Sequence, residues 1–125
     1  METLTVGHSN RAFSEFTDLL LTHRVTLLVD VRSRPASRYF PWFGAKYLEE
    51  HLPMLYIWRG KTLGGLDATI HPDDFEDSIE ELIRLSKRYR TCVMCAEKSP
   101  EKCHRESKIA VALRARRITV VHIGI

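Results

Sequence analysis

The feature that most constrains this fold is the alternation of short apolar segments with longer amphipathic ones along the whole chain. Apolar runs of strand length are followed by segments whose apolar residues recur every three to four positions, the period of a helix buried on one side. The predicted strands are residues 1–6, 25–31, 54–58, 91–96 and 118–123. Parallel strands need crossover connections, so the pattern predicts an α/β fold: a mainly parallel five-stranded sheet flanked by helices, a Rossmann-like doubly wound three-layer sandwich.

The composition of the strands predicts their places in that sheet. The apolar runs at Leu4, Leu27 to Val29 and Val93 to Met94 suit central, parallel strands, whereas Met54 to Trp58 mixes polar and aromatic residues and suits an edge. In the commonest doubly wound order, 3-2-1-4-5, a crevice would open between the first and fourth strands. We adopt that order as a working assumption.

The length and composition fit one such domain. The chain has 125 residues, of which 44% are hydrophobic, and a domain of this size buries roughly two-thirds of its unfolded surface. No internal repeat, low-complexity stretch or composition shift divides the sequence. Residues 1–125 are therefore expected to form a single α/β domain.

The cysteine count and the hydropathy indicate the cellular compartment. There are three cysteines, and no apolar run approaches the roughly 20 residues that a membrane span requires. We expect a cytoplasmic protein with reduced thiols and no membrane partner. The net charge is +3, but 16 acidic residues offset 19 basic ones, so charge gives only weak support for a polyanionic partner. The sequence does not identify a cofactor or an oligomeric state.

Reactive side chains gather after the fourth predicted strand. That strand ends at the polar segment Glu97-Lys98-Ser99-Pro100, and helical periodicity resumes from Cys103. The first turn of the new helix should then hold Cys103, His104 and Arg105. Ligands bind at the carboxyl ends of strands in open parallel sheets, and a helix N-terminus offers unpaired N–H groups to an anion.

Polar residues also follow the first two strands. The first strand breaks at Gly7-His8-Ser9-Asn10, and the second ends at Asp30-Val31-Arg32, where alternation places Asp30 and Arg32 on one face. Since carboxyl ends of parallel strands share one edge of a sheet, these loops and the loop after the fourth strand should meet. The residues expected to converge are His8, Asp30, Arg32, Cys95, Glu97 and Arg105.

Several motifs, taken in this order, resemble the DUF488 family of uncharacterised proteins. They are Thr5-Val6-Gly7-His8-Ser9, Leu28 to Arg32 with Arg34-Pro35 and Ser37-Arg38, Leu63-Gly64-Gly65, Met94 to Lys98, Cys103-His104-Arg105 and Val120 to Ile123. The resemblance covers nearly the whole chain and implies functional positions without an activity. Many members carry a longer, aromatic-rich segment before the Cys-Ala-Glu strand. In this chain that segment is compressed to Leu66 to Arg90. The resemblance therefore does not imply any function that resides in the longer segment.

The three cysteines have different expected roles. Cys92 and Cys95 are three positions apart in a strand and should point to opposite faces, which argues against a redox pair and places Cys92 in the core. Cys95 is either a small buried hydrophobe or a chemical group. Cys103, beside His104 and Arg105, is either a reactive thiolate, a metal ligand or a packing residue.

The first functional interpretation is an enzyme or binding protein with a pocket for a phosphate-bearing ligand, a nucleotide or nucleic acid. The candidate anion-binding residues are Ser9, Arg32, Arg34, Ser37, Arg38, His104 and Arg105. In an enzyme, the nucleophile would be Cys103 or Cys95, the base His8 or His104, and the acid or orienting group Glu97 or Asp30. Cys95 and Arg105 are ten positions apart, so the Cys-x5-Arg loop of cysteine phosphatases is absent.

Two other interpretations stay open. Cys95, Cys103, His104 and His8 offer sulfur and nitrogen donors that would suit zinc, although the paired Cys-x2-Cys spacing of closed structural sites is lacking and arginines nearby disfavour a cation. The third interpretation is a non-catalytic interaction module. For the aromatic loop at Tyr39, Phe40, Trp42 and Phe43, a lid or core role is favoured over base stacking.

Overall fold

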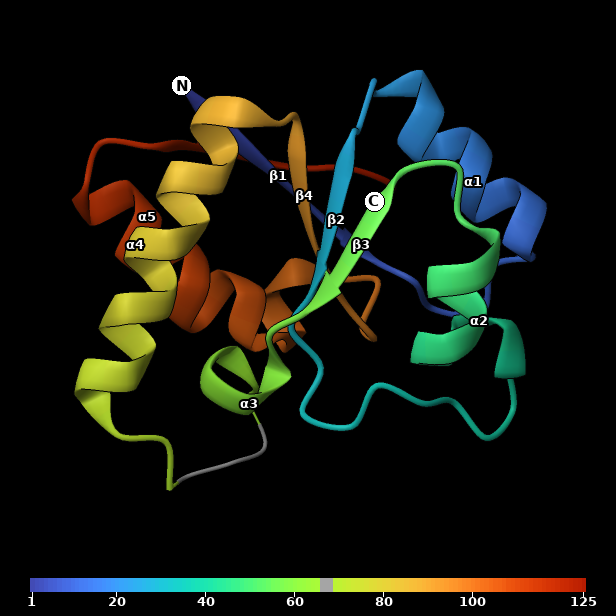
Figure 1. The fold of residues 1–125 in the computed structure, drawn as a ribbon, viewed down its shortest axis with the longest axis horizontal. Helices are drawn as coiled ribbons and strands as arrows, with labels where there is room; N and C mark the ends of the chain where they lie inside the picture. Colours follow the sequence, from blue (N-terminus) through green and yellow to red (C-terminus); the bar gives the residue numbers. More distant parts are fainter. Residues whose placement is uncertain (66–68) are drawn as a thin grey trace.

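The computed structural model describes residues 1–65 and 69–125. Its centre is a sheet of five strands, all parallel to their neighbours, in the order β3-β2-β4-β1-β5 (Figure 1). The strands are β1 (Glu2–Gly7), β2 (Leu27–Asp30), β3 (Leu55–Trp58), β4 (Thr91–Cys95) and β5 (Thr119–His122). The predicted parallel α/β sheet is confirmed, with β1, β2 and β4 central and β3 at an edge.

Helices cover both faces of the sheet, so the molecule has three layers (Figure 1). The α-helices are α1 (Phe13–Thr22), α2 (Ala45–His51), α3 (Gly60–Leu63), α4 (Pro72–Arg88) and α5 (Val111–Ala115). Two 3₁₀ turns, Pro41–Phe43 and Pro100–Lys102, and a π-helix, Arg105–Ala110, complete the architecture. Within the described residues, no helix combines the length and apolarity needed to cross a bilayer. The compressed segment from Leu66 to Arg90 begins outside the described residues and continues into α4.

The assumed strand order 3-2-1-4-5 is wrong, because β4 lies between β2 and β1. From β1 through β2 to β3 the chain moves toward one edge, with α1 and α2 on one face; through β4 to β5 it moves back, with α4 and α5 on the other face (Figure 1). Right-handed crossovers require this change of face when the direction reverses. All five residues of β4 are buried, as its central place requires.

Side chains alternate along the strands between two separate hydrophobic cores. Leu28, Cys92 and Met94 belong to the core that contains Phe16 of α1 and Leu48 of α2. The other core, beneath α4 and α5, includes the following strand residues: Leu27, Val29, Val93 and Cys95. Cys92 and Cys95 therefore point to opposite faces, as alternation predicted.

Candidate functional site

Three loops meet at the carboxyl edge of the sheet through backbone hydrogen bonds. The N–H of His8 donates to the carbonyl of Cys95 at 2.9 Å, and the N–H of Ser9 donates to Ala96 at 3.0 Å. Beyond β2, the N–H of Val31 donates to Met94 at 3.0 Å. The loops after β1, β2 and β4 are thus held side by side although they are far apart in the sequence.

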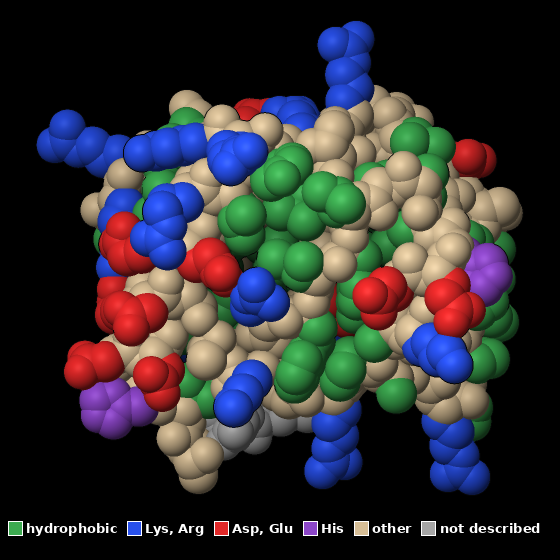
Figure 2. All heavy atoms as spheres, viewed as in Figure 1, with side chains coloured by type: hydrophobic (Ala, Val, Ile, Leu, Met, Phe, Trp, Pro, Cys, Tyr) green, Lys and Arg blue, Asp and Glu red, His purple; other side chains and the backbone are tan. Residues whose placement is uncertain are grey.

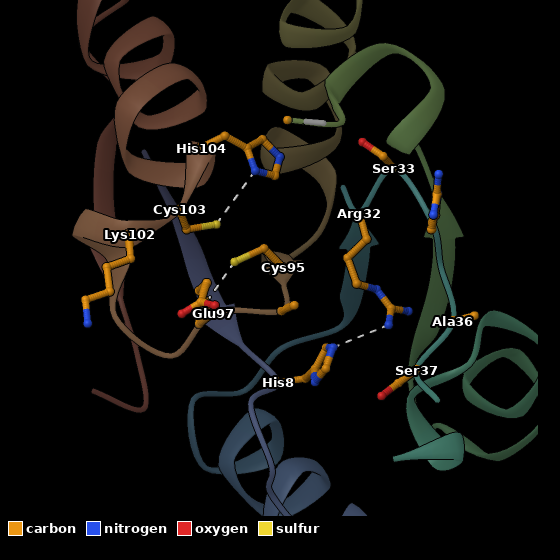
Figure 3. A pocket seen from close by; sticks show the side chains of 13 residues that line it. His8, Arg32, Ser33, Ala36, Ser37, Cys95, Glu97, Lys102, Cys103 and His104 are labelled. Atoms are coloured by element: carbon orange, nitrogen blue, oxygen red, sulfur yellow. Dashed lines mark hydrogen bonds between the residues drawn. The ribbon is translucent and has the colours of Figure 1, made fainter. Parts of the chain in front are cut away.

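A cavity of about 550 Å³ lies between these loops, at the edge where open parallel sheets bind ligands. Figure 3 shows cysteine and histidine side chains from the segment after β4 on one side and Arg32 and Ser33 from the loop after β2 on the other. Its lining residues are His8, Arg32, Ser33, Arg34, Ala36, Ser37, Gly65, Cys95, Ala96, Glu97, Lys102, Cys103 and His104.

Arg32 is buried and fixed in direction. Its Nε and Nη2 donate to the two carboxylate oxygens of Asp30 at 2.9 and 2.7 Å, and its backbone N–H donates to the same carboxylate at 3.0 Å. Tyr56 also donates to Asp30, at 2.6 Å, and Trp58 Nε1 donates to the Arg32 carbonyl at 2.7 Å. The guanidinium therefore keeps Nη1 for the cavity. Asp30 is fully buried behind Arg32 and does not line the cavity.

His8 is neutral and its tautomer is determined by its contacts. Nδ1 donates to the Ser9 carbonyl at 2.8 Å, so Nε2 carries a lone pair and accepts from Arg32 Nη1 at 3.4 Å. The ring stacks on Phe43 with centroids 4.3 Å apart. Burial lowers the pKa of His8 to about 4, and the Arg32 charge acts in the same direction. His8 thus presents a hydrogen-bond acceptor near the Arg32 guanidinium.

Cys103 is the partly exposed thiol of the site. Hydrogen bonding from the Cys95 thiol lowers the pKa of Cys103 strongly, burial opposes this, and His104 and the Arg105 N–H lower it further. The Arg105 N–H lies 3.5 Å from Sγ, and His104 Nδ1 lies 3.7 Å from it (Figure 3). The pKa of Cys103 is therefore lowered and that of Cys95 is raised, which makes Cys103 the more acidic thiol of the two.

The structure gives Arg105 a different role from the expected direct contact with an anion. Its side chain is fully buried and donates to the carbonyls of Glu97 and Lys98 and to the sulfur of Cys95. These contacts use both terminal nitrogens to shape the loop after β4. Arg105 does not line the cavity, so it positions the loop and Cys95.

The helix start also differs from the expectation. Cys103 has extended backbone angles (φ −135°, ψ 144°), and the π-helix begins only at Arg105. The N–H groups of Arg105 and Glu106 are already engaged by the sulfur and the carbonyl of Cys103. The N–H groups that this helix start would offer to an anion are therefore already used by Cys103.

The remaining predicted residues divide between the cavity and its surroundings. Arg34, Ser37 and Glu97 line the cavity, whereas exposed Arg38 lies outside it and packs on the Tyr39 ring at 5.8 Å. Ser9 lines an adjoining hollow that shares Ser37 and Glu97 with the cavity. Of the predicted aromatic lid, Phe43 is a fully buried core residue and Tyr39 is 77% exposed.

Within residues 1–65 and 69–125, no group of three or more His, Cys, Asp and Glu side chains could hold a metal ion. In the same part of the chain, the buried Nε2 of His104 has no hydrogen-bond partner. His104 lines the cavity and packs so closely on Gly65 that a Cβ there would lie 2.5 Å from its ring.

Comparison with protein families shows the family to which the chain belongs. The family described as "Domain of unknown function DUF488" matches residues 12–71 and 67–110. The chain belongs to the DUF488 family. No curated protein matches it. The DUF488 match includes Asp30, Arg32, both cavity cysteines and Arg105, whereas His8 and β5 lie outside the matched residues.

Sequence reasoning assigned no role to three residues of this DUF488 site, Ser33, Tyr56 and Trp58. Ser33 lines the cavity, and Tyr56 and Trp58 hold Asp30 and Arg32 in place. An available signal was alternation along β3: Tyr56 and Trp58 share a face, and β3 pairs with β2 so that Trp58 lies opposite Asp30. Ser33 adjoins predicted site residues.

Proposed function

We propose that this protein binds a small phosphate-bearing ligand of nucleotide size in the cavity and acts on it through Cys103 as nucleophile. The observation that carries the proposal is one arrangement: a cavity with an arginine locked by a carboxylate on one side and a partly exposed cysteine on the other. The first group suits an oxyanion, and the second suits an electrophilic centre attached to it.

Charge in the cavity supports an anionic ligand. Arg32, Arg34 and Lys102 contribute guanidinium and ammonium groups to the lining, against one carboxylate, Glu97. The Nε and Nη2 of Arg32 are held by Asp30, so the guanidinium is already ordered before a ligand binds. Binding therefore loses no side-chain entropy at Arg32. The hydroxyls of Ser33 and Ser37 also lie on the lining.

Cavity size favours a mononucleotide over a nucleic acid strand. About 550 Å³ falls within the range of roughly 300–1,000 Å³ that holds small ligands. Figure 2 shows basic and acidic side chains interspersed on the visible face, without the continuous cationic track that a strand would follow. Phosphate on the small ligand is therefore the feature that the cavity would recognise.

The side chains divide the chemistry as follows. The Cys103 thiolate would attack the electrophilic centre, and His104, 3.7 Å from the sulfur, would stabilise the thiolate and exchange a proton with the leaving group. Neutral His8, whose Nε2 accepts from Arg32 Nη1, would help to keep that guanidinium directed at the ligand. Arg32 would hold the phosphate.

Two exposed arginines on one loop give a matched test of the anion pocket. Arg34 lines the cavity and Arg38 does not. AMP at a hundred times its dissociation constant should stabilise the wild type by about 2.7 kcal/mol, which thermal denaturation measures. Arg34→Gln should weaken AMP binding by about tenfold, and Arg38→Gln should leave it unchanged.

Equal weakening by both variants would indicate diffuse surface charge and contradict the pocket. No stabilisation by AMP or inorganic phosphate would contradict the proposal and favour a non-catalytic interaction module. Stabilisation by a short oligonucleotide but not by AMP would contradict the assignment of a small ligand.

A further inference from the structure

We propose that Cys103 and Cys95 are an oxidisable pair, in which a hydroperoxide oxidises Cys103 and Cys95 then closes a reversible disulfide with it. Both sulfurs are at one side of the cavity, and Figure 3 shows them directed toward the same space between the loops. The pair is separate from Cys92-x-x-Cys95, whose side chains point to opposite faces.

Contacts place the two sulfurs together. The Cys95 thiol donates to the Glu97 carbonyl at 3.6 Å, and the Cys95 and Cys103 side chains lie close enough for each to shift the pKa of the other. Arg105 contacts both: its backbone N–H lies 3.5 Å from Cys103 Sγ, and its Nη1 donates to Cys95 Sγ. A single residue that bridges two sulfurs keeps them in one place while the side chains react.

Accessibility divides the roles between the two cysteines. Cys103 is partly exposed and lines the cavity, so a small oxidant reaches it from solvent. Cys95 is only 2% exposed, so it is protected from direct oxidation. This is the expected arrangement of a reactive thiolate with a neighbouring resolving cysteine.

The chemistry balances with a hydroperoxide as the oxidant. The Cys103 thiolate attacks the terminal peroxide oxygen, the O–O bond breaks, and the alkoxide or hydroxide leaves and takes a proton from water. Cys103 becomes a sulfenic acid after a two-electron oxidation. The Cys95 sulfur then attacks the Cys103 sulfur, the S–O bond breaks, and the hydroxyl leaves as water with the Cys95 proton.

Oxidation of Cys103 prepares Cys95 for its attack on the Cys103 sulfur. The hydrogen bond to Cys103 is the largest cause that keeps the pKa of Cys95 high, followed by burial and the Cys103 charge, while Arg105 acts in the opposite direction. When Cys103 becomes a neutral sulfenic acid, the negative charge beside Cys95 disappears and the Arg105 guanidinium remains. Deprotonation of Cys95 then becomes easier, and the resolving attack follows.

The consequence for the site rests on the proposed function, whereas the pairing itself does not. A disulfide would remove the Cys103 thiolate and stop its chemistry until a reducing thiol restores it. Oxidation would therefore act as a reversible off-switch of the cavity.

Peptide mapping under non-reducing conditions tests the pair. The protein is treated with hydrogen peroxide, with and without the sulfenic acid trap dimedone, and digested with trypsin. Wild type should lose the mass of two hydrogen atoms and link the peptide of residues 91–98 to that of residues 103–105. Because the first peptide holds both Cys92 and Cys95, Cys92→Ala is the control and should form the same link.

In Cys95→Ser, which retains a hydrogen-bonding side chain beside Arg105, Cys103 should instead accumulate as the dimedone adduct, and thermal denaturation verifies folding of the variant. Over-oxidation of Cys103 to the sulfinic acid without a link in wild type, or loss of the link in Cys92→Ala, would overturn the proposal. A link that forms while AMP fails to bind would leave the pair intact and contradict only the proposed function. AMP binding without a link would contradict the cysteine pair and leave the proposed function intact.

Discussion

His8 is the residue whose protonation the fold opposes most directly in the cavity. Burial lowers the pKa of His8 from 6.5 to about 4, so the unfolded chain binds more protons between those values and folding stability rises with pH. The stability that depends on neutral His8 is fully present above about pH 6.5. It is lost as the pH falls toward 4, which lowers the unfolding free energy by about 3 kcal/mol. Chemical denaturation across this range should show it.

His8→Gln removes the titrating ring and is the reference for this measurement. The difference in unfolding free energy between wild type and variant should be constant above about pH 6.5 and should shift against wild type as the pH falls. Parallel curves throughout would mean that His8 is not held neutral by the fold.

Asp30 is the counter-charge that holds the buried Arg32 guanidinium in place. Asp30→Asn would leave the 6%-exposed guanidinium buried without a counter-charge, and the unfolding free energy should fall by about 3–5 kcal/mol. Tyr56→Phe removes one hydrogen bond while Arg32 still occupies the carboxylate, so it should cost only about 1.5 kcal/mol. Urea denaturation distinguishes the two, and equal losses would contradict this account of the pair.

At the scale of elements, the end of β1 must pass very close to the loop after β4. A Cβ at Gly7 would lie 1.7 Å from the Glu97 carbonyl oxygen and 2.4 Å from its carbon, which are backbone atoms that cannot rotate away. Gly7→Ala should therefore cost at least about 3 kcal/mol of stability or prevent folding.

Gly44, the N-cap of α2, is the matched control. Its φ of −68° suits any residue, and the nearest atom to an added Cβ is 3.3 Å away. Because this contact is tight and alanine caps a helix less well than glycine, Gly44→Ala should lower the stability by only about 0.5–1 kcal/mol in thermal denaturation. If the two alanine variants are equally stable, the contact between β1 and the loop is looser than described.

The elements also show what the sequence could and could not reveal. Periodicity correctly predicted a helix with one buried side after Cys103, where Ile109 and Leu113 are buried, because burial depends on spacing. It did not show that Cys103 stays extended and that the π-helix begins at Arg105, since those depend on local hydrogen bonds. Nor did it show that Arg105 points inward, because an arginine in a polar segment gives no sign of direction.

At the scale of the whole molecule, the order of the strands was the main feature that local patterns could not supply. Apolar composition identified β1, β2 and β4 as central, but which of them lies in the middle depends on long-range pairing. The loops after β1 and β4 are neighbours in the assumed order and in the observed one. The sequence could therefore predict that His8 and Cys95 lie close together despite the wrong order.

The observed order makes a prediction about local stability. β4 is hydrogen-bonded on both sides, to β2 and β1, whereas β3 and β5 each have one neighbour. In native-state hydrogen exchange, β4 amides should exchange only through global unfolding, and those of β3 and β5 through smaller openings. Protection in β3 equal to that in β4 would contradict the assigned order.

The central claim is that an anion-binding cavity contains the Cys103 thiolate, and cysteine alkylation tests it most directly. Iodoacetamide labelling is followed by peptide mass spectrometry between about pH 6 and about pH 9, with and without AMP. Cys103 alone should be labelled, at a rate nearly independent of pH, and AMP should slow it, because Cys92 and Cys95 are 0% and 2% exposed. A Cys103 rate that rises steadily with pH and ignores AMP would contradict the account.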